Sequence, residues 1–135
     1  MASKAKGRVA GVDTQPRVLV VDGDESMRRA LTRTLRLAGF EVEAFRYVEA
    51  LLARGFLGRD VCLVLDVDSP GIEGKALAQN LRAMKRSIAT IFVTALGPDE
   101  VAVRFEGLSP LAVLCKPFNK EDLLDAVGRA QWSLN

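Results

Sequence analysis

The sequence contains no histidine among its 135 residues. This absence excludes histidine-dependent catalytic triads, histidine-ligated zinc or iron, and a role as a phosphohistidine carrier. Only two cysteines occur, Cys62 and Cys115, which are too few for a four-cysteine zinc site. Because each lies in an apolar run, we expect both thiols to be buried. Any chemistry must therefore use carboxylates, hydroxyls, lysine or arginine.

Long apolar runs and a strong excess of charge are also missing. No run approaches the roughly 18 residues that cross a bilayer, and the basic N-terminus lacks the apolar stretch of a secretory signal. We therefore expect a cytoplasmic protein with no membrane contact. The net charge is only +2, and residues 1–16 carry that excess, which leaves the rest neutral. This balance gives no support for nucleic-acid binding.

Length and composition indicate one globular domain. Hydrophobic residues make up 49% and charged residues 27% of the chain, as in ordinary globular proteins. Residues 1–16 are small, polar or basic and end at Pro16, so we predict that they form a mobile tail. The folded domain is then expected to span residues 17–135.

From residue 17 onward, short apolar runs alternate with segments of helical periodicity. Strands are predicted at 18–21, 41–45, 61–65, 88–94 and 111–115. Helices are predicted at about 25–38, 48–54, 74–84, 98–106 and 119–132. Asp24 or Ser26 should cap the first helix, and Gly39 should end it. Regular alternation of this kind favours an α/β fold whose parallel sheet has helices on both faces.

Polar side chains stand at the ends of four predicted strands: Asp22, Asp66, Thr94 and Lys116. Each has a plain explanation alone, such as a cap, a turn or a solvated cation. The carboxyl ends of parallel strands share one edge, however, so we expect the four side chains to meet. Two carboxylates suit Mg²⁺, while a hydroxyl and an ammonium suit phosphoryl oxygens. Asp66 would accept the phosphoryl group, since a carboxylate can form an aspartyl phosphate.

Four segments in order resemble the receiver domains of bacterial two-component response regulators, and the resemblance spans residues 17–132. The segments are VLVVDGDESMRRAL, CLVLDVDSPGIEG, IFVTALG and LCKPF. The resemblance implies a flavodoxin-like (CheY-like), doubly wound sheet of five parallel strands in the order 2-1-3-4-5.

The same resemblance implies roles for individual residues. Asp66 would be phosphorylated, Thr94 would hydrogen-bond the phosphoryl group, and Lys116 would pair with one of its oxygens. Asp22, Asp66 and the backbone carbonyl of Asp68 would bind Mg²⁺. The peptide bond between Lys116 and Pro117 would be cis.

The resemblance also implies partners. A histidine kinase or a phosphotransfer protein would donate the phosphoryl group, and a downstream protein would read the change. Homodimerisation through the last helices is a further expectation.

The chain departs from the family pattern at Gly23 and at Val113, while Asp68 occupies a variable position. Gly23 stands where the family has a second acidic residue, which weakens the expected metal site. Val113 replaces the aromatic residue whose rotation commonly signals activation. The side chain of Asp68, close to Asp66, could either bind the cation or repel an incoming phosphoryl group.

Two other functions stay open at this point. A degenerate receiver could bind its partner without phosphorylation. Residues 65–69, LDVDS, also resemble the opening motif of haloacid-dehalogenase-type phosphatases, in which two carboxylates act as nucleophile and general acid/base. That motif normally follows the first strand of a longer chain, so we expect the protein not to be an enzyme.

Overall fold

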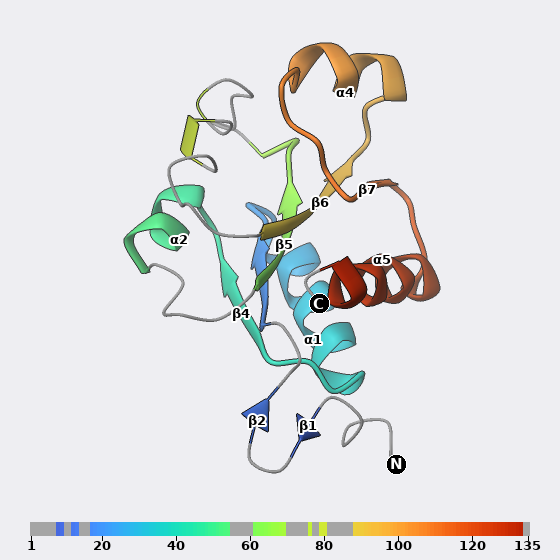
Figure 1. The fold of residues 1–135 in the computed structure, drawn as a ribbon. Coiled ribbons are helices and arrows are strands. Elements are labelled where there is room, and N and C mark those ends of the chain that lie inside the picture. Colours follow the sequence, from blue (N-terminus) through green and yellow to red (C-terminus); the bar gives the residue numbers. More distant parts are fainter. Residues whose placement is uncertain are drawn as a thin grey trace.

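A computed structural model gives the fold and describes residues 8–9, 12–13, 17–54, 61–69, 76, 79–80 and 88–133 (Figure 1). Five parallel strands form the main sheet: β3 (Arg17–Val21), β4 (Val42–Phe45), β5 (Val61–Asp66), β6 (Ile88–Thr94) and β7 (Ala112–Cys115). Their order is β4-β3-β5-β6-β7, which is 2-1-3-4-5 in chain order. The predicted fold class is confirmed.

The central strand explains why the apolar runs are continuous. β5 pairs with β3 on one side and with β6 on the other, and all six of its residues are buried. A parallel strand covered on both faces needs apolar side chains at every position rather than at alternate ones. Asp66, the last residue of β5, is the exception to this apolar run, which marks it as a special position.

Four helices are described in full: α1 (Glu25–Leu37), α2 (Val48–Arg54), α4 (Pro98–Arg104) and α5 (Lys120–Ser133). Asp24 is the N-cap of α1, as predicted, because its carboxylate accepts hydrogen bonds from the backbone N–H groups of Ser26 and Met27. Gly39 follows α1 with a positive φ of 100°, a conformation that glycine adopts readily. The helix predicted at 74–84 lies largely outside the described residues, of which residues 76, 79 and 80 are helical.

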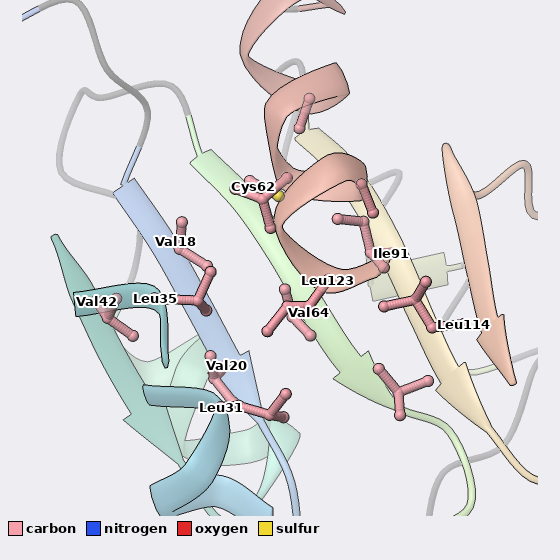
Figure 2. Close-up of a cluster of buried hydrophobic side chains, with 14 of the residues drawn as sticks. Val18, Val20, Leu31, Leu35, Val42, Cys62, Val64, Ile91, Leu114 and Leu123 are labelled. Carbon is pink, nitrogen blue, oxygen red and sulfur yellow. The ribbon is translucent and has the colours of Figure 1, made fainter. Parts of the chain in front are cut away.

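Two apolar cores lie on opposite faces of the sheet. On one face, α1 and α5 cover side chains of all five strands, and Leu31, Leu35 and Leu123 point from these helices toward the strands (Figure 2). On the other face, Leu51 of α2 and Val101 of α4 pack against the alternate residues of the strands. The rings of Phe92 and Phe105 also contact here, with their centroids 5.3 Å apart. The sheet is therefore held rigidly from both sides, and its carboxyl edge is a fixed platform.

The structure departs from expectation at one cysteine. Cys62 is buried as predicted, but Cys115 is exposed, so that prediction is wrong. The reason is position: β7 is an edge strand, and Val113 on the same face is 41% exposed. An apolar run on an edge strand does not imply burial on both faces.

The N-terminal segment also holds an element that the sequence did not predict. Strands β1 (Arg8–Val9) and β2 (Val12–Asp13) form an antiparallel pair. The mobility of residues 1–16 stays a prediction. Among the described residues, no helix combines the length and the apolar character that crossing a membrane requires.

Candidate functional site

The four predicted strand-end residues are set at the carboxyl edge by the backbone ladder. The amide of Asp22 donates to the carbonyl of Phe45, which keeps it in register with β4 although it lies past the end of β3. Asp66 and Thr94 are the last residues of β5 and β6. The amide of Lys116 donates to the carbonyl of Thr94 at 2.8 Å, which carries β7 one residue further along the same edge.

Asp22 is a buried carboxylate that is only half satisfied. The residue is 0% exposed, and its Oδ1 accepts a hydrogen bond from the amide of Asp24 at 2.9 Å. Its Oδ2 is buried without a hydrogen-bond partner among the described residues. Burial, and then the nearby charge of Asp66, raise the pKa of Asp22 to about 6. An unpaired buried oxygen of this kind is suited to a cation or a proton.

Asp66 and Lys116 form an ion pair, in line with the expectation that side chains at the strand ends meet. The Nζ atom of Lys116 lies 3.2 Å from Oδ1 of Asp66, which also accepts the amide of Asp68 at 2.9 Å. Burial alone would lower the pKa of Lys116, but the hydrogen bonds and charges of Asp66 and Asp68 outweigh it and raise that pKa. Lys116 is therefore a fixed cation, and the peptide bond to Pro117 is cis, as predicted.

Asp68 makes contacts that the sequence did not predict. Its Oδ1 accepts the hydroxyl of Thr94 at 2.6 Å, and its Oδ2 accepts the amide of Ala95 at 2.7 Å. Oδ2 also lies 3.3 Å from Nζ of Lys116. Burial acts to raise the pKa of Asp68, but these hydrogen bonds lower it overall, so the side chain is ionised. Side-chain direction in a loop has no periodic signal, so only the proximity of Asp68 to Asp66 could be anticipated.

Gly23 is covered by a second unpredicted contact. Its amide donates to Oγ of Ser69 at 3.1 Å. A Cβ atom added at Gly23 would lie 3.2 Å from the same Oγ. A hydroxyl from the loop after β5 therefore lies against the position at which the family's second acidic side chain would begin.

The carboxyl edge of this fold thus presents a buried carboxylate, a paired carboxylate, a hydroxyl and a fixed ammonium. The sequence model of the response regulator receiver domain matches residues 18–128. The chain belongs to this family.

Relatives and solved structures agree with the assignment. Nodulation protein W of Bradyrhizobium diazoefficiens is 36% identical over 124 residues, which are 92% of this chain and 55% of that protein. The C4-dicarboxylate transport transcriptional regulatory protein DctD of Pseudomonas aeruginosa is 33% identical, over 90% of this chain and 26% of that protein. This receiver domain thus spans about half or less of the length of these curated relatives.

Among solved structures, the crystal structure of FixJ-N has a TM-score of 0.78 and 30% identity, covering 90% of this chain and 97% of that one. The chemotaxis response regulator CheY4 of Vibrio cholerae has a TM-score of 0.73 and 27% identity, covering 86% and 98% of the two chains. Similarity over nearly the full length of both neighbours confirms the receiver fold.

Receiver domains generally bind Mg²⁺ at their acidic pocket, and the residues of this chain can be tested for fit. The unpartnered Oδ2 of Asp22 offers a hard oxygen ligand beside the carboxylate of Asp66. No group of three acidic or thiol side chains within the described residues could hold a metal together. The carboxylate of Asp68, in particular, is engaged by Thr94, Ala95 and Lys116. The carboxylates of Asp22 and Asp66 are therefore the side chains at this edge that fit an Mg²⁺ ion.

Proposed function

We propose that this receiver domain accepts a phosphoryl group on Asp66 and thereby changes its affinity for another protein. The observation that carries this proposal is the contact of 3.2 Å between Nζ of Lys116 and Oδ1 of Asp66 at the edge shared with Asp22 and Thr94. Asp66 is only 5% exposed, and the ammonium of Lys116 holds its carboxylate in one orientation, which positions it for a single incoming group.

The proposed protein donor carries a phosphorylated histidine, and it must be another chain because this one contains no histidine. An oxygen of Asp66 forms a new bond to phosphorus as the phosphorus–nitrogen bond of the donor breaks, and the imidazole nitrogen keeps the electron pair. Lys116 balances negative charge on the phosphoryl oxygens, and the hydroxyl of Thr94 is the hydrogen-bond donor on the neighbouring strand. The donor is a histidine kinase or a phosphotransfer protein.

Asp22 and Asp66 would hold Mg²⁺ through their carboxylates, with the backbone carbonyl of Asp68 as a further ligand. Bound there, the ion supplies positive charge that offsets the charge on the phosphoryl oxygens. Because Gly23 stands where the family has a second acidic residue, and because Asp24 caps α1, Asp22 is the one acidic side chain at the end of β3 that is left to bind this ion. We expect weaker Mg²⁺ binding than in receivers with two acidic residues at that point.

The setting of this reaction is part of the proposal. Both cysteines are free thiols, which suits the reducing cytoplasm. The response is a protein–protein contact rather than catalysis, and a second copy of the chain is one candidate partner.

A phosphodonor experiment tests the function directly. The protein is incubated with Mg²⁺ and acetyl phosphate, and its intact mass is measured. We expect a mass gain of one phosphoryl group that is absent in Asp66→Asn and retained in Asp125→Asn, a matched change on α5. The proposal is wrong if wild type gains no mass, or if Asp66→Asn gains as much as wild type does.

The alternatives gain no support. The comparisons do not favour a degenerate receiver that works without phosphorylation. The phosphatase hypothesis needs Asp68 as a general acid/base, but both oxygens of Asp68 already accept hydrogen bonds. Turnover of a generic phosphate ester by the wild-type protein would revive that hypothesis.

A further inference from the structure

Asp68 holds three donors at once. The hydroxyl of Thr94 and the amide of Ala95 lie 2.6 and 2.7 Å from its two oxygens, and the ammonium of Lys116 lies 3.3 Å from Oδ2. The carboxylate therefore bridges the ends of β6 and β7 from the loop after β5. This is the arrangement of a bound anion, supplied by the chain itself.

Two of these donors, Thr94 and Lys116, are those that the proposed function assigns to a phosphoryl group on Asp66, and the Ala95 amide directly follows Thr94 in the chain. Lys116 already touches Asp66, and Thr94 lies at the end of the next strand of the sheet. Each donor proton can satisfy one strong acceptor well, and a charge-assisted hydrogen bond is about twice as strong as a neutral one. The hydroxyl of Thr94 has one proton, so it cannot donate a full hydrogen bond to a phosphoryl oxygen and to a carboxylate oxygen of Asp68 at the same time.

We infer that Asp68 is an internal competitor of the phosphoryl group. Its carboxylate binds Thr94, Ala95 and Lys116 in the resting protein, and phosphorylation of Asp66 displaces it from Thr94 and Ala95. This inference rests on the proposed function. It assigns to the side chain of Asp68 a positioning role that sets how tightly the phosphorylated state is held, and leaves only the backbone carbonyl of this residue as a metal ligand.

Displacement differs from simple charge repulsion in what happens to Asp68. Repulsion would weaken phosphoryl binding while Asp68 stays on Thr94. Displacement requires the Asp68 carboxylate to leave, while the Ala95 amide exchanges one anionic acceptor for another. The carboxyl carbon of Asp68 and the amide of Ala95 are therefore the atoms to observe.

The test uses Mg²⁺ with beryllofluoride, a stable analogue of the phosphoryl group, and three proteins: wild type, Asp68→Asn and Asp99→Asn. Asp99 is an exposed carboxylate in the first turn of α4, so the second variant removes the same charge without freeing these donors. We expect the apparent dissociation constant to fall about tenfold in Asp68→Asn, roughly the effect of one charge-assisted hydrogen bond, and to change less than about twofold in Asp99→Asn. Asp68→Ala, which keeps no acceptor, should bind at least as tightly as Asp68→Asn.

Nuclear magnetic resonance supplies the second readout on the same samples. On addition of beryllofluoride to wild type, we expect the carboxyl carbon of Asp68 to shift while the Ala95 amide proton stays downfield. Equal affinities in wild type and Asp68→Asn, or an Asp68 signal that does not move when beryllofluoride binds, would overturn this inference and leave the proposed function standing. Failure of all the proteins to bind beryllofluoride would overturn both.

Discussion

Asp22 and Asp68 flank the same carboxylate, that of Asp66, but their surroundings are opposite. Asp22 is fully buried, has one oxygen without a partner among the described residues, and has its pKa raised to about 6. Asp68 is partly exposed, has both oxygens hydrogen-bonded, and has its pKa lowered. On the Asp22 side, Oδ2 of the carboxylate has no hydrogen-bond partner among the described residues, and the nearby guanidinium of Arg28 donates to the backbone carbonyl of Asp22 instead. On the Asp68 side, the ammonium of Lys116 is already paired with carboxylates.

This difference teaches which ligand each side needs. A buried carboxylate without compensation costs folding free energy that a cation can recover. A matched cluster gains nothing from another anion unless one of its members leaves. The apo protein is therefore poised to bind a cation on the Asp22 side and resists an anion on the Asp68 side.

Removal of Lys116 should have the largest effect on stability, because it leaves Asp66 and Asp68 without their shared cation. The Asp68 side of the site would then lack a matched charge, as the Asp22 side does. We expect Lys116→Met to lower the free energy of unfolding by about 2 kcal/mol at pH 8, less than for a fully buried pair because the lysine side chain is 25% exposed. Urea denaturation measures this loss. Lys120→Met, a change at an exposed lysine at the start of α5, should stay within about 0.5 kcal/mol of wild type.

The pH dependence of that loss has a definite sign. The charge of Lys116 helps to keep the pKa of Asp22 down, so removal of Lys116 raises the pKa of Asp22 further. Acids with a raised folded-state pKa add stability at low pH that disappears as the pH rises. The loss in Lys116→Met should therefore be larger at pH 8 than at pH 5, and an equal loss at both values would contradict the account.

Neutralising Asp22 should have the opposite sign. A pKa raised from 3.8 to about 6 corresponds to about 3 kcal/mol of destabilisation once the group is ionised. Asp22→Asn removes this destabilisation, but burial of the new amide group offsets part of the benefit. We therefore expect the free energy of unfolding of Asp22→Asn to exceed that of wild type by about 1–2 kcal/mol at pH 8 without divalent cations. As the pH rises from about 4 to about 6, Asp22 ionises and wild type should lose stability, whereas the variant should not show that decline.

Magnesium provides the control for Asp22. Mg²⁺ should stabilise wild type in proportion to its binding and should stabilise Asp22→Asn much less. The stability advantage of Asp22→Asn over wild type should therefore shrink or reverse when Mg²⁺ is added. Thermal unfolding with Mg²⁺ and with a chelator measures both. A variant less stable than wild type at pH 8 in chelator would show that Asp22 is structurally required rather than strained.

The sequence predicts the site less completely than the fold, and particular residues show why. The run at 61–65 and the polar residues after each strand follow from periodicity and from the common edge of parallel strands. They suffice to place Asp22, Asp66, Thr94 and Lys116 together. The hydrogen bonds of Asp68 and Ser69 depend on loop rotamers, which no spacing rule specifies, so they emerge only from the structure. The prediction that Cys115 is buried was wrong for a related reason, because strand order rather than local sequence pattern decides which side chains an edge strand buries.

The coupling between Asp68 and Thr94 should be smaller than either charge effect. Their hydrogen bond of 2.6 Å is charge-assisted but partly solvated. In a double-mutant cycle of Asp68→Asn and Thr94→Val, we expect a coupling energy of about 1 kcal/mol in urea denaturation. The pair Asp99→Asn and Thr94→Val should be additive within about 0.5 kcal/mol, and equal coupling in both cycles would remove the special status of Asp68.

Substitution of Gly23, next to Asp22, should give the smallest effect on stability. Replacement of glycine by alanine normally stabilises a protein by about 0.4–1 kcal/mol through the unfolded state. Here the new Cβ would lie 3.2 Å from Oγ and 3.6 Å from Cβ of Ser69, so Ser69 must shift and the gain should shrink to within about 0.5 kcal/mol of zero.

Gly128 in α5 is the matched control, because a Cβ there meets nothing within 4 Å, and Gly128→Ala should gain about 1 kcal/mol. Ser69→Ala in the same protein should restore the gain at position 23. A full gain in Gly23→Ala alone would mean that the hydroxyl of Ser69 does not fill the space of the missing acidic side chain. The weak cation side would then follow from lost charge alone, and Gly23→Asp should strengthen Mg²⁺ binding without any change at Ser69.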